Sequence, residues 1–210
     1  MKYLKSFKES LAGIDTNLET IERCKDLNEG EFLELLKMNC KNFSFNNDML
    51  WRSKVKGKKS DLQLFQPSPR NAKPVAFPNF FNQIADDSNF PVKRKNSLIG
   101  STDPEKLKIL VGDDLFLVIP YDNSEIVFCP IIDLWALSDN RRGGSELVDK
   151  TPISEDNFIM VNYTSDFKVP LDELSKLNKA ITHAGVEFFT SSKCLLLHES
   201  KIDWLRNFLK

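Results

Sequence analysis

The chain of 210 residues has few of the side chains from which protein metal sites are built. It contains only two histidines, His183 and His198, and its four cysteines form no CxxC pair. Zinc sites usually take three or four such ligands from short, regular spacings. We therefore expect no metal centre, and we expect the cysteines to be reduced, structural thiols, as is usual in the cytosol.

Long apolar runs and an excess of one charge are also missing. Charged residues interrupt the N-terminal pattern between Lys2 and Lys8, and no run approaches the length of a membrane span, so neither a signal peptide nor a membrane partner is expected. Lys and Arg number 29 against 30 Asp and Glu, which leaves no global field to attract nucleic acid. The sequence predicts a cytoplasmic protein whose contacts with other molecules are local.

The composition that remains is that of a globular domain. Hydrophobic residues make up 41% of the chain and charged residues 28%, so the chain should fold around a core. Apolar residues recur every three or four positions from Leu4 to Ile21, and Asn28 with Glu31 gives the capping-box pattern of a second helix. We expect residues 1–47 to form an N-terminal helical segment packed on a main domain at 48–210.

Short apolar runs in the main domain predict strands at 49–52, 97–100, 115–119, 126–128, 158–161, 186–189 and 194–197. Helices are expected at 104–110, at 171–180 and in the amphipathic stretch at the C-terminus; the second would have one apolar side made of Leu171, Leu174, Leu177 and Ile181. Helices first and strands later indicate an α+β fold.

Five prolines between Gln66 and Pro91 exclude a central strand there and predict a long surface excursion, for which a binding role is a fair hypothesis. A second polar loop carries Arg141 and Arg142.

Glu187 is the unusual residue of the chain. It stands in the apolar run 186–189, where a carboxylate beside a core would be held at a fixed place and tuned by its surroundings. The alternative is a glutamate that points to solvent from an edge strand.

Two further segments carry groups that would complement such an acid. An arginine fork at Arg52 fits a pyrophosphate at two points and stays charged. A hydroxyl at Ser101 can orient a ribose or the carboxylate, while Thr102 is better suited to tie two backbone segments together. The competing interpretation is that Ser101 to Asp103 only cap the helix that begins at Pro104.

If Arg52, Ser101 and Glu187 meet around one cleft, the set suits NAD as a substrate. Nicotinamide leaves as a neutral molecule, so the enzyme must stabilise an oxocarbenium-like centre and position an acceptor. Phe128, Tyr121 or Trp135 would supply an aromatic wall for the nicotinamide, unless they are core residues.

The segments Leu50-Trp51-Arg52, Leu98-Ile99-Gly100-Ser101-Thr102-Asp103 and Gly185-Val186-Glu187 resemble, in order and approximate spacing, the Arg, Ser-Thr-Ser and Glu motifs of the arginine-serine-glutamate class of ADP-ribosyltransferases. More narrowly, the chain looks like a group of small bacteriophage proteins with such a core.

The resemblance implies a core of two packed, mostly antiparallel sheets and an NAD-consuming mono-ADP-ribosyltransferase that acts on a host macromolecule in the host cytoplasm. It implies catalytic roles for Glu187, Ser101 and Arg52. NAD contacts would come from Arg52, Ser53, Ser101, Thr102 and Phe128, with Arg52 on the phosphates and backbone at Ser53 near the nicotinamide amide.

Three departures from the family pattern qualify this expectation. Asp103 stands where the third motif residue is commonly Ser, and Ser53 follows the arginine where Gly is frequent, so the nicotinamide amide would need backbone contacts from a non-Gly residue. Gly185 stands where enzymes that modify arginine usually have Glu or Gln, so we expect the acceptor not to be arginine. The alternatives are an NAD glycohydrolase and a non-catalytic module that uses the proline-rich excursion and the Arg141-Arg142 loop to hold a host protein or nucleic acid.

Overall fold

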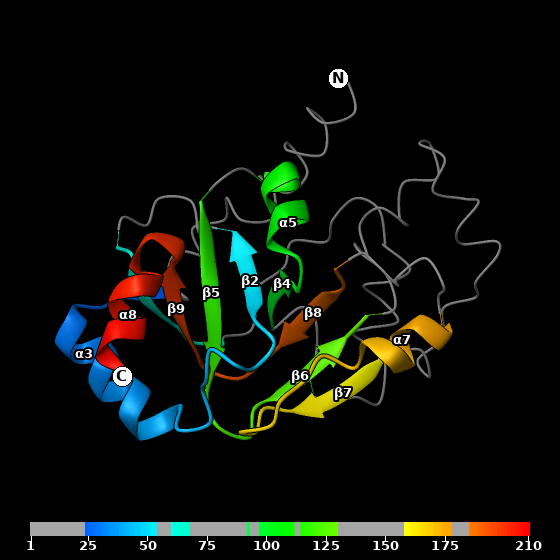
Figure 1. Ribbon diagram of the computed structural model, residues 1–210, viewed down its shortest axis with the longest axis horizontal. Helices are drawn as coiled ribbons and strands as arrows, with labels where there is room; N and C mark the ends of the chain where they lie inside the picture. The colour runs from blue at the N-terminus through cyan, green and yellow to red at the C-terminus, as the bar shows by residue number, and fades with distance from the viewer. Residues whose placement is uncertain are drawn as a thin grey trace.

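The computed structural model describes residues 24–53, 60–67, 92, 97–111, 114–129, 158–177 and 185–210. The nine strands in these residues form one sheet, and all neighbouring strands are antiparallel (Figure 1). In their order across the sheet, the strands are β1 (Cys24–Asp26), β3 (Leu62–Phe65), β9 (Cys194–His198), β5 (Leu115–Pro120), β2 (Leu50–Ser53), β4 (Leu98–Ser101), β8 (Glu187–Thr190), β6 (Glu125–Phe128) and β7 (Ile159–Asn162).

The helices in the same residues are α3 (Glu29–Asn39), α5 (Pro104–Val111), α7 (Leu171–Leu177) and α8 (Ile202–Phe208), with a 3-10 turn, η5 (Glu199–Lys201), before α8. The predicted α+β class is confirmed. Where two packed sheets were expected, however, the described strands are joined by hydrogen bonds into one continuous sheet.

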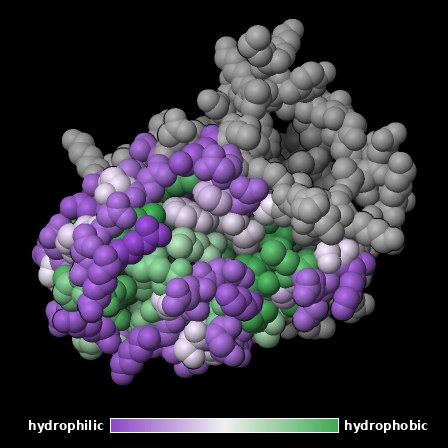
Figure 2. Space-filling model, viewed as in Figure 1, coloured by the Kyte–Doolittle hydropathy of each residue, from purple (hydrophilic) through white to green (hydrophobic). Residues whose placement is uncertain are grey.

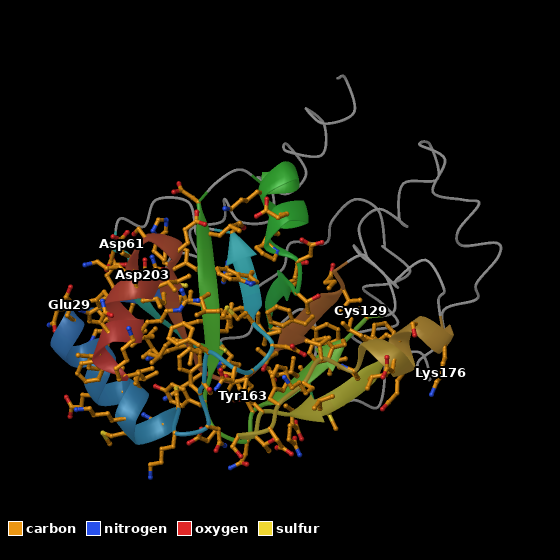
Figure 3. All side chains as sticks on the ribbon, in the orientation of Figure 1. Glu29, Asp61, Cys129, Tyr163, Lys176 and Asp203 are labelled. Atoms are coloured by element: carbon orange, nitrogen blue, oxygen red, sulfur yellow. The ribbon has the colours of Figure 1, made fainter. Side chains whose placement is uncertain are left out.

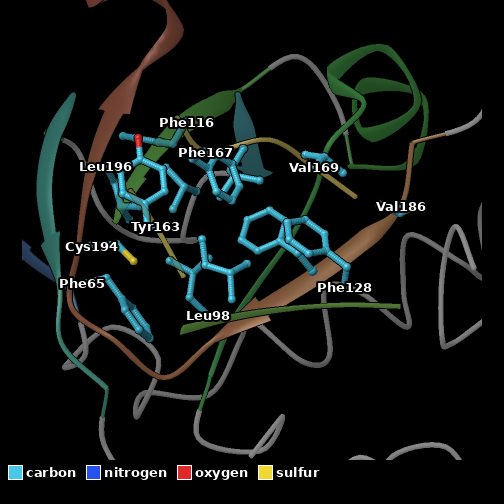
Figure 4. Close-up of a cluster of buried hydrophobic side chains, with 14 of the residues drawn as sticks. Phe65, Leu98, Phe116, Phe128, Tyr163, Phe167, Val169, Val186, Cys194 and Leu196 are labelled. Atoms are coloured by element: carbon cyan, nitrogen blue, oxygen red, sulfur yellow. The ribbon is translucent and has the colours of Figure 1, made fainter. Parts of the chain in front are cut away.

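One face of the sheet bends around the first buried cluster (Figure 4). Phe65 and Cys194 reach this cluster from β3 and β9, whereas Phe128 and Phe188 reach it from β6 and β8. Strands that lie several positions apart in the sheet therefore share one core, which requires the sheet to curve. Each fully buried Phe or Leu adds about 1.5–3 kcal/mol to folding, so closing this curve is strongly favourable.

The opposite face packs on α3 and α8, which lie together beside β9 (Figure 1). Phe32 of α3 and Leu205 of α8 are fully buried with Leu117 and Leu197 of the sheet. Along β9, Cys194 and Leu196 face the first cluster while Leu195 and Leu197 face the second. A strand buried on both faces reads as a continuous apolar run, which is why this part of the sheet was predictable.

Hydrophilic and apolar side chains are also separated on the surface of the protein (Figure 2). In Figure 2, hydrophilic residues cover the outside of α3 and α8, and apolar residues gather toward the middle of the face, over the strands.

Helix α7 contributes Leu174, which is fully buried, but Leu171 is 45% exposed. Leu171 is the first residue of α7 and does not share the burial of Leu174, with which it was expected to lie on one side of the helix.

The capping box predicted for α3 is confirmed. Asn28 Oδ1 accepts a hydrogen bond from the Glu31 amide at 2.9 Å, and Glu31 Oε2 accepts one from the Asn28 amide at 2.9 Å. The bond from the Asn28 backbone, helped by the neighbouring Lys25, lowers the pKa of Glu31. The helix expected at 4–21 lies outside the described residues, and the three-residue strand β1 was too short to predict.

All four cysteines are buried and none forms a disulfide bond, which agrees with the prediction of structural thiols. Burial raises the pKa of Cys40 and of Cys194 well above its ordinary value, so both are neutral thiols that pack as small apolar groups. Within the described residues no group of three or more potential ligands is arranged to hold a metal ion. None of the described helices combines the length and the apolar character needed to cross a membrane.

Candidate functional site

Three adjacent strands in the middle of the sheet carry the three motifs. Strand β2 holds Arg52, β4 holds Ser101 and β8 begins with Glu187, and their order across the sheet is β2, β4, β8. Ser101 is the direct cross-strand partner of Glu187. Side chains at paired positions of an antiparallel ladder lie on the same face, with Cβ atoms about 4.5–5.5 Å apart. The hydroxyl and the acid are therefore neighbours, although 86 positions separate them in sequence.

Glu187 is held in the interior of the protein and not on an edge strand. Strand β8 lies between β4 and β6, and Glu187 is only 5% exposed. Its backbone carbonyl accepts a hydrogen bond from the Cys129 amide at 2.9 Å, and Figure 3 marks Cys129 beside β8. The solvent-facing alternative is thus wrong, and the acid has the fixed, buried position that the apolar run predicted.

Thr102 joins the two motif segments, as predicted. Its amide donates to the Val186 carbonyl at 3.0 Å, and its Oγ1 accepts from the Val186 amide at 2.9 Å. This pair of bonds continues the ladder between β4 and β8 beyond the strand ends. Glu187 therefore follows directly after a residue whose backbone is fixed on both its polar groups.

The segment after Ser101 also caps a helix. Asp103 Oδ1 accepts from the Glu105 amide at 3.0 Å, and Ser101 Oγ accepts from the Asp103 amide at 3.1 Å. The capping interpretation is therefore correct for Asp103, at the N-terminus of α5. A hydroxyl has one donor and two acceptor positions, so the bond that Ser101 accepts leaves its O–H able to serve a carboxylate or a ribose.

Arg52 is the motif residue that the structure does not bring to the face of Ser101 and Glu187. Trp51 is the cross-strand partner of Ser101, and successive side chains of a strand point to opposite faces. Arg52 is therefore directed to the other face, with Leu50, and is only 6% exposed. Its Nε donates to the Ser53 carbonyl at 3.1 Å. The raised pKa of Cys194 comes mainly from burial, which the nearby Arg52 charge opposes, so the guanidinium lies toward the first cluster.

The remaining cofactor-binding candidates are placed as follows. Phe128 has no exposed surface and packs between Phe167 and Phe188, at ring-centroid distances of 6.2 and 6.3 Å. It pairs with Phe188 and so lies on the face opposite Glu187; the prediction that it stacks on nicotinamide is wrong because the ring is a core residue. Ser53 ends β2 and is half-buried.

Of the other aromatic candidates, Tyr121 packs on the second cluster, where burial raises its pKa. Trp135, the proline-rich segment beyond residue 67 apart from Val92, and the Arg141-Arg142 loop lie outside the described residues.

The chain matches no protein-family model, no curated protein and no solved structure. The chemistry of this site must therefore be derived from its own residues.

Two glycines of the motif segments, Gly100 and Gly185, allow close approach of neighbouring chain segments. A Cβ at Gly100 would lie 2.2 Å from the Trp51 carbonyl oxygen and 2.6 Å from the Phe188 ring, so only glycine lets β2, β4 and Phe188 approach this closely. A Cβ at Gly185 would lie 2.0 Å from the Cβ of Asp103. An isolated glycine at a strand is the sequence signal for such close approach.

Proposed function

We propose that the protein is an NAD-consuming mono-ADP-ribosyltransferase, with Glu187 and Ser101 as its catalytic pair and a host macromolecule as its acceptor. The observation that carries the proposal is the direct pairing of Ser101 with Glu187 on adjacent central strands, with exposures of 8% and 5%. The Arg-bearing strand β2 is the next one in the sheet, so the three motif segments lie on neighbouring strands.

The pair has the chemistry that NAD cleavage requires. As the bond between nicotinamide and ribose breaks, positive charge develops at the anomeric carbon while a neutral base departs. A fixed carboxylate stabilises that charge most effectively where water is largely excluded, because the interaction is then weakly screened. The Ser101 hydroxyl lies on the same face and is placed to orient the ribose or the carboxylate.

The acceptor in this proposal is not arginine. Activation of a guanidinium acceptor in the family relies on a side chain two residues before the catalytic glutamate, and here that position is Gly185, where the backbone of Asp103 leaves no room for one. We also propose that the two ends of the bent sheet, which share the first buried cluster, correspond to the two sheets of an ADP-ribosyltransferase core.

Arg52 has a different role in the proposal from the one that the resemblance implies. Its side chain follows the alternation of β2 to the opposite face, where it supports the fold beneath the site. We therefore leave Arg52 out of the catalytic pair. Substitution of Arg52 therefore distinguishes a phosphate ligand from a structural cation.

The test is incubation with NAD labelled in its adenylate phosphate, with and without bacterial lysate, for the unmodified protein, Glu187→Gln and the matched surface control Glu173→Gln. Loss of one transition-state-stabilising group typically costs about 10²–10³ in rate, so Glu187→Gln should lose that much while Glu173→Gln keeps full activity. Nuclease or protease treatment of the labelled product then identifies the acceptor class.

The other outcomes decide between the remaining functions. Nicotinamide release that does not require lysate and leaves free ADP-ribose would identify an NAD glycohydrolase. No release, combined with no thermal stabilisation at millimolar NAD, would favour the non-catalytic module. Activity of Glu187→Gln within about tenfold of the unmodified protein would contradict the catalytic role of the acid.

A further inference from the structure

The residues that follow Ser101 and those that precede Glu187 are joined by two sets of contacts. Thr102 makes the first set, and Asp103 makes the second. Beyond the Thr102 bonds to Val186, Asp103 Oδ2 accepts from the Gly185 amide at 3.4 Å, while Oδ1 of the same carboxylate accepts from the Glu105 amide at 3.0 Å. One carboxylate thus contacts both the first turn of α5 and the backbone two residues before Glu187.

The fit between Asp103 and Gly185 is also steric. A Cβ at position 185 would lie 2.0 Å from Asp103 Cβ, 2.6 Å from its amide nitrogen and 2.9 Å from its Cα. Two of these three atoms are backbone, so a side-chain rotation cannot relieve the contact. Asp103 therefore sets how closely the chain at Gly185 approaches β4, and Gly185 is the residue that permits this approach.

We infer that Asp103 is a positioning residue for Glu187. It ties the backbone at Gly185 to α5, a helix that packs beside β2, and so fixes the position at which the Glu187 side chain meets Ser101. The effect on catalysis rests on the proposed function, whereas the tie itself does not. An error of about 1 Å in the placement of a catalytic group can cost 10²-fold in rate, so a looser Gly185 should lower kcat.

Asp103→Asn separates the two contacts of the carboxylate. An amide has a single acceptor oxygen, so it can serve either Glu105 or Gly185 but not both. The bond to Glu105 is the shorter one, at 3.0 Å against 3.4 Å, so asparagine should keep the helix cap and present its NH₂ group to the Gly185 amide. Asp103→Ser is a second variant that retains an oxygen able to cap α5 and removes Oδ2, the carboxylate oxygen that accepts from the Gly185 amide.

The matched control is Asp166→Asn. Asp166 is an exposed carboxylate that accepts a hydrogen bond from Thr164 Oγ1 at 2.6 Å in the loop after β7. It makes the same change of charge far from the catalytic pair in sequence. Both its activity and its amide exchange near Gly185 should match those of the unmodified protein.

The experiment combines amide hydrogen exchange of Gly185 and Val186 with NAD-cleavage kinetics. Asp103→Asn and Asp103→Ser should exchange at least tenfold faster at Gly185 and Val186, with Glu105 to Leu107 unchanged, and should show kcat about tenfold lower with KM within about twofold. Unchanged exchange at Gly185 would overturn the tie. Faster exchange with unchanged kcat in an active enzyme would overturn the positioning role. If the unmodified protein cleaves no NAD, the proposed function fails on its own, and exchange alone decides whether Asp103 holds Gly185.

Discussion

Two parts of the sheet, one made of β3, β9 and β5 and the other where β4 meets β8, are held together by different kinds of interaction. Around β3, β9 and β5, apolar side chains alternate between two clusters and the helices α3 and α8 cover one face. Where β4 meets β8, the strand ends are joined instead by hydrogen bonds that the side chains of Thr102 and Asp103 accept, and by glycines that allow close backbone contact. The first part supplies stability, and the second gives fixed positions to the polar groups Ser101 and Glu187.

The largest effect on stability should come from the apolar part. Phe32→Ala removes a fully buried ring that packs against Trp204 at a centroid distance of 6.1 Å, and it should lower the free energy of unfolding by about 3–5 kcal/mol. Phe208, which is 40% exposed, is the matched control, and Phe208→Ala should cost far less. Urea unfolding of both variants measures the difference; equal losses would contradict the assignment of the core.

Substitution of Arg52 tests whether this buried residue stabilises the fold or binds NAD. Because its guanidinium is buried on the face opposite Glu187, Arg52→Ala should destabilise the fold by about 1.5–3 kcal/mol, the usual contribution of a hydrogen bond to a charged group. The affinity of the Arg52→Ala variant for NAD, measured by calorimetry on the folded fraction, should differ less than threefold from that of the unmodified protein. A loss of affinity above tenfold without loss of stability would instead make Arg52 a phosphate ligand.

Gly100 tests the close approach in the polar part. Gly100→Ala should cost about 1–3 kcal/mol, because the new methyl group meets the Trp51 carbonyl oxygen at 2.2 Å and the Phe188 ring at 2.6 Å. Gly30 in α3 is the control: the nearest atom to an added Cβ is Asn28 Oδ1 at 3.3 Å, and helix propensity favours alanine. Gly30→Ala should therefore change stability by less than about 1 kcal/mol. Thermal unfolding of the pair checks the order.

The smallest effect concerns the α3 capping box and its dependence on pH. The lowered pKa of Glu31 means that the charged form is favoured in the folded state, so its contribution is present above its usual value of 4.5 and is lost as pH falls through the lower folded pKa. The difference in Tm between the unmodified protein and Glu31→Gln should thus shrink on acidification below that value. A difference that grows toward low pH would contradict the capping bond.

The parts that were predictable from sequence are those where one local rule decides the outcome. Apolar runs located β5, β9 and the strand of Glu187, and the Asn28-Glu31 pattern located the start of α3. The side to which Arg52 points was not predictable, because a one-residue difference in register reverses the face and register depends on strands distant in sequence. The steric contact between Asp103 and Gly185 was not predictable either, because it also joins segments that are distant in sequence.

The most direct measurement is a double-mutant cycle on the catalytic pair, with single-turnover release of nicotinamide as the readout. Since Ser101 and Glu187 are paired across β4 and β8 and act on one ribose, Ser101→Ala should cost at least tenfold on its own and little more when Glu187→Gln is already present. Losses that multiply independently, or a Ser101→Ala variant with full activity, would contradict a shared site.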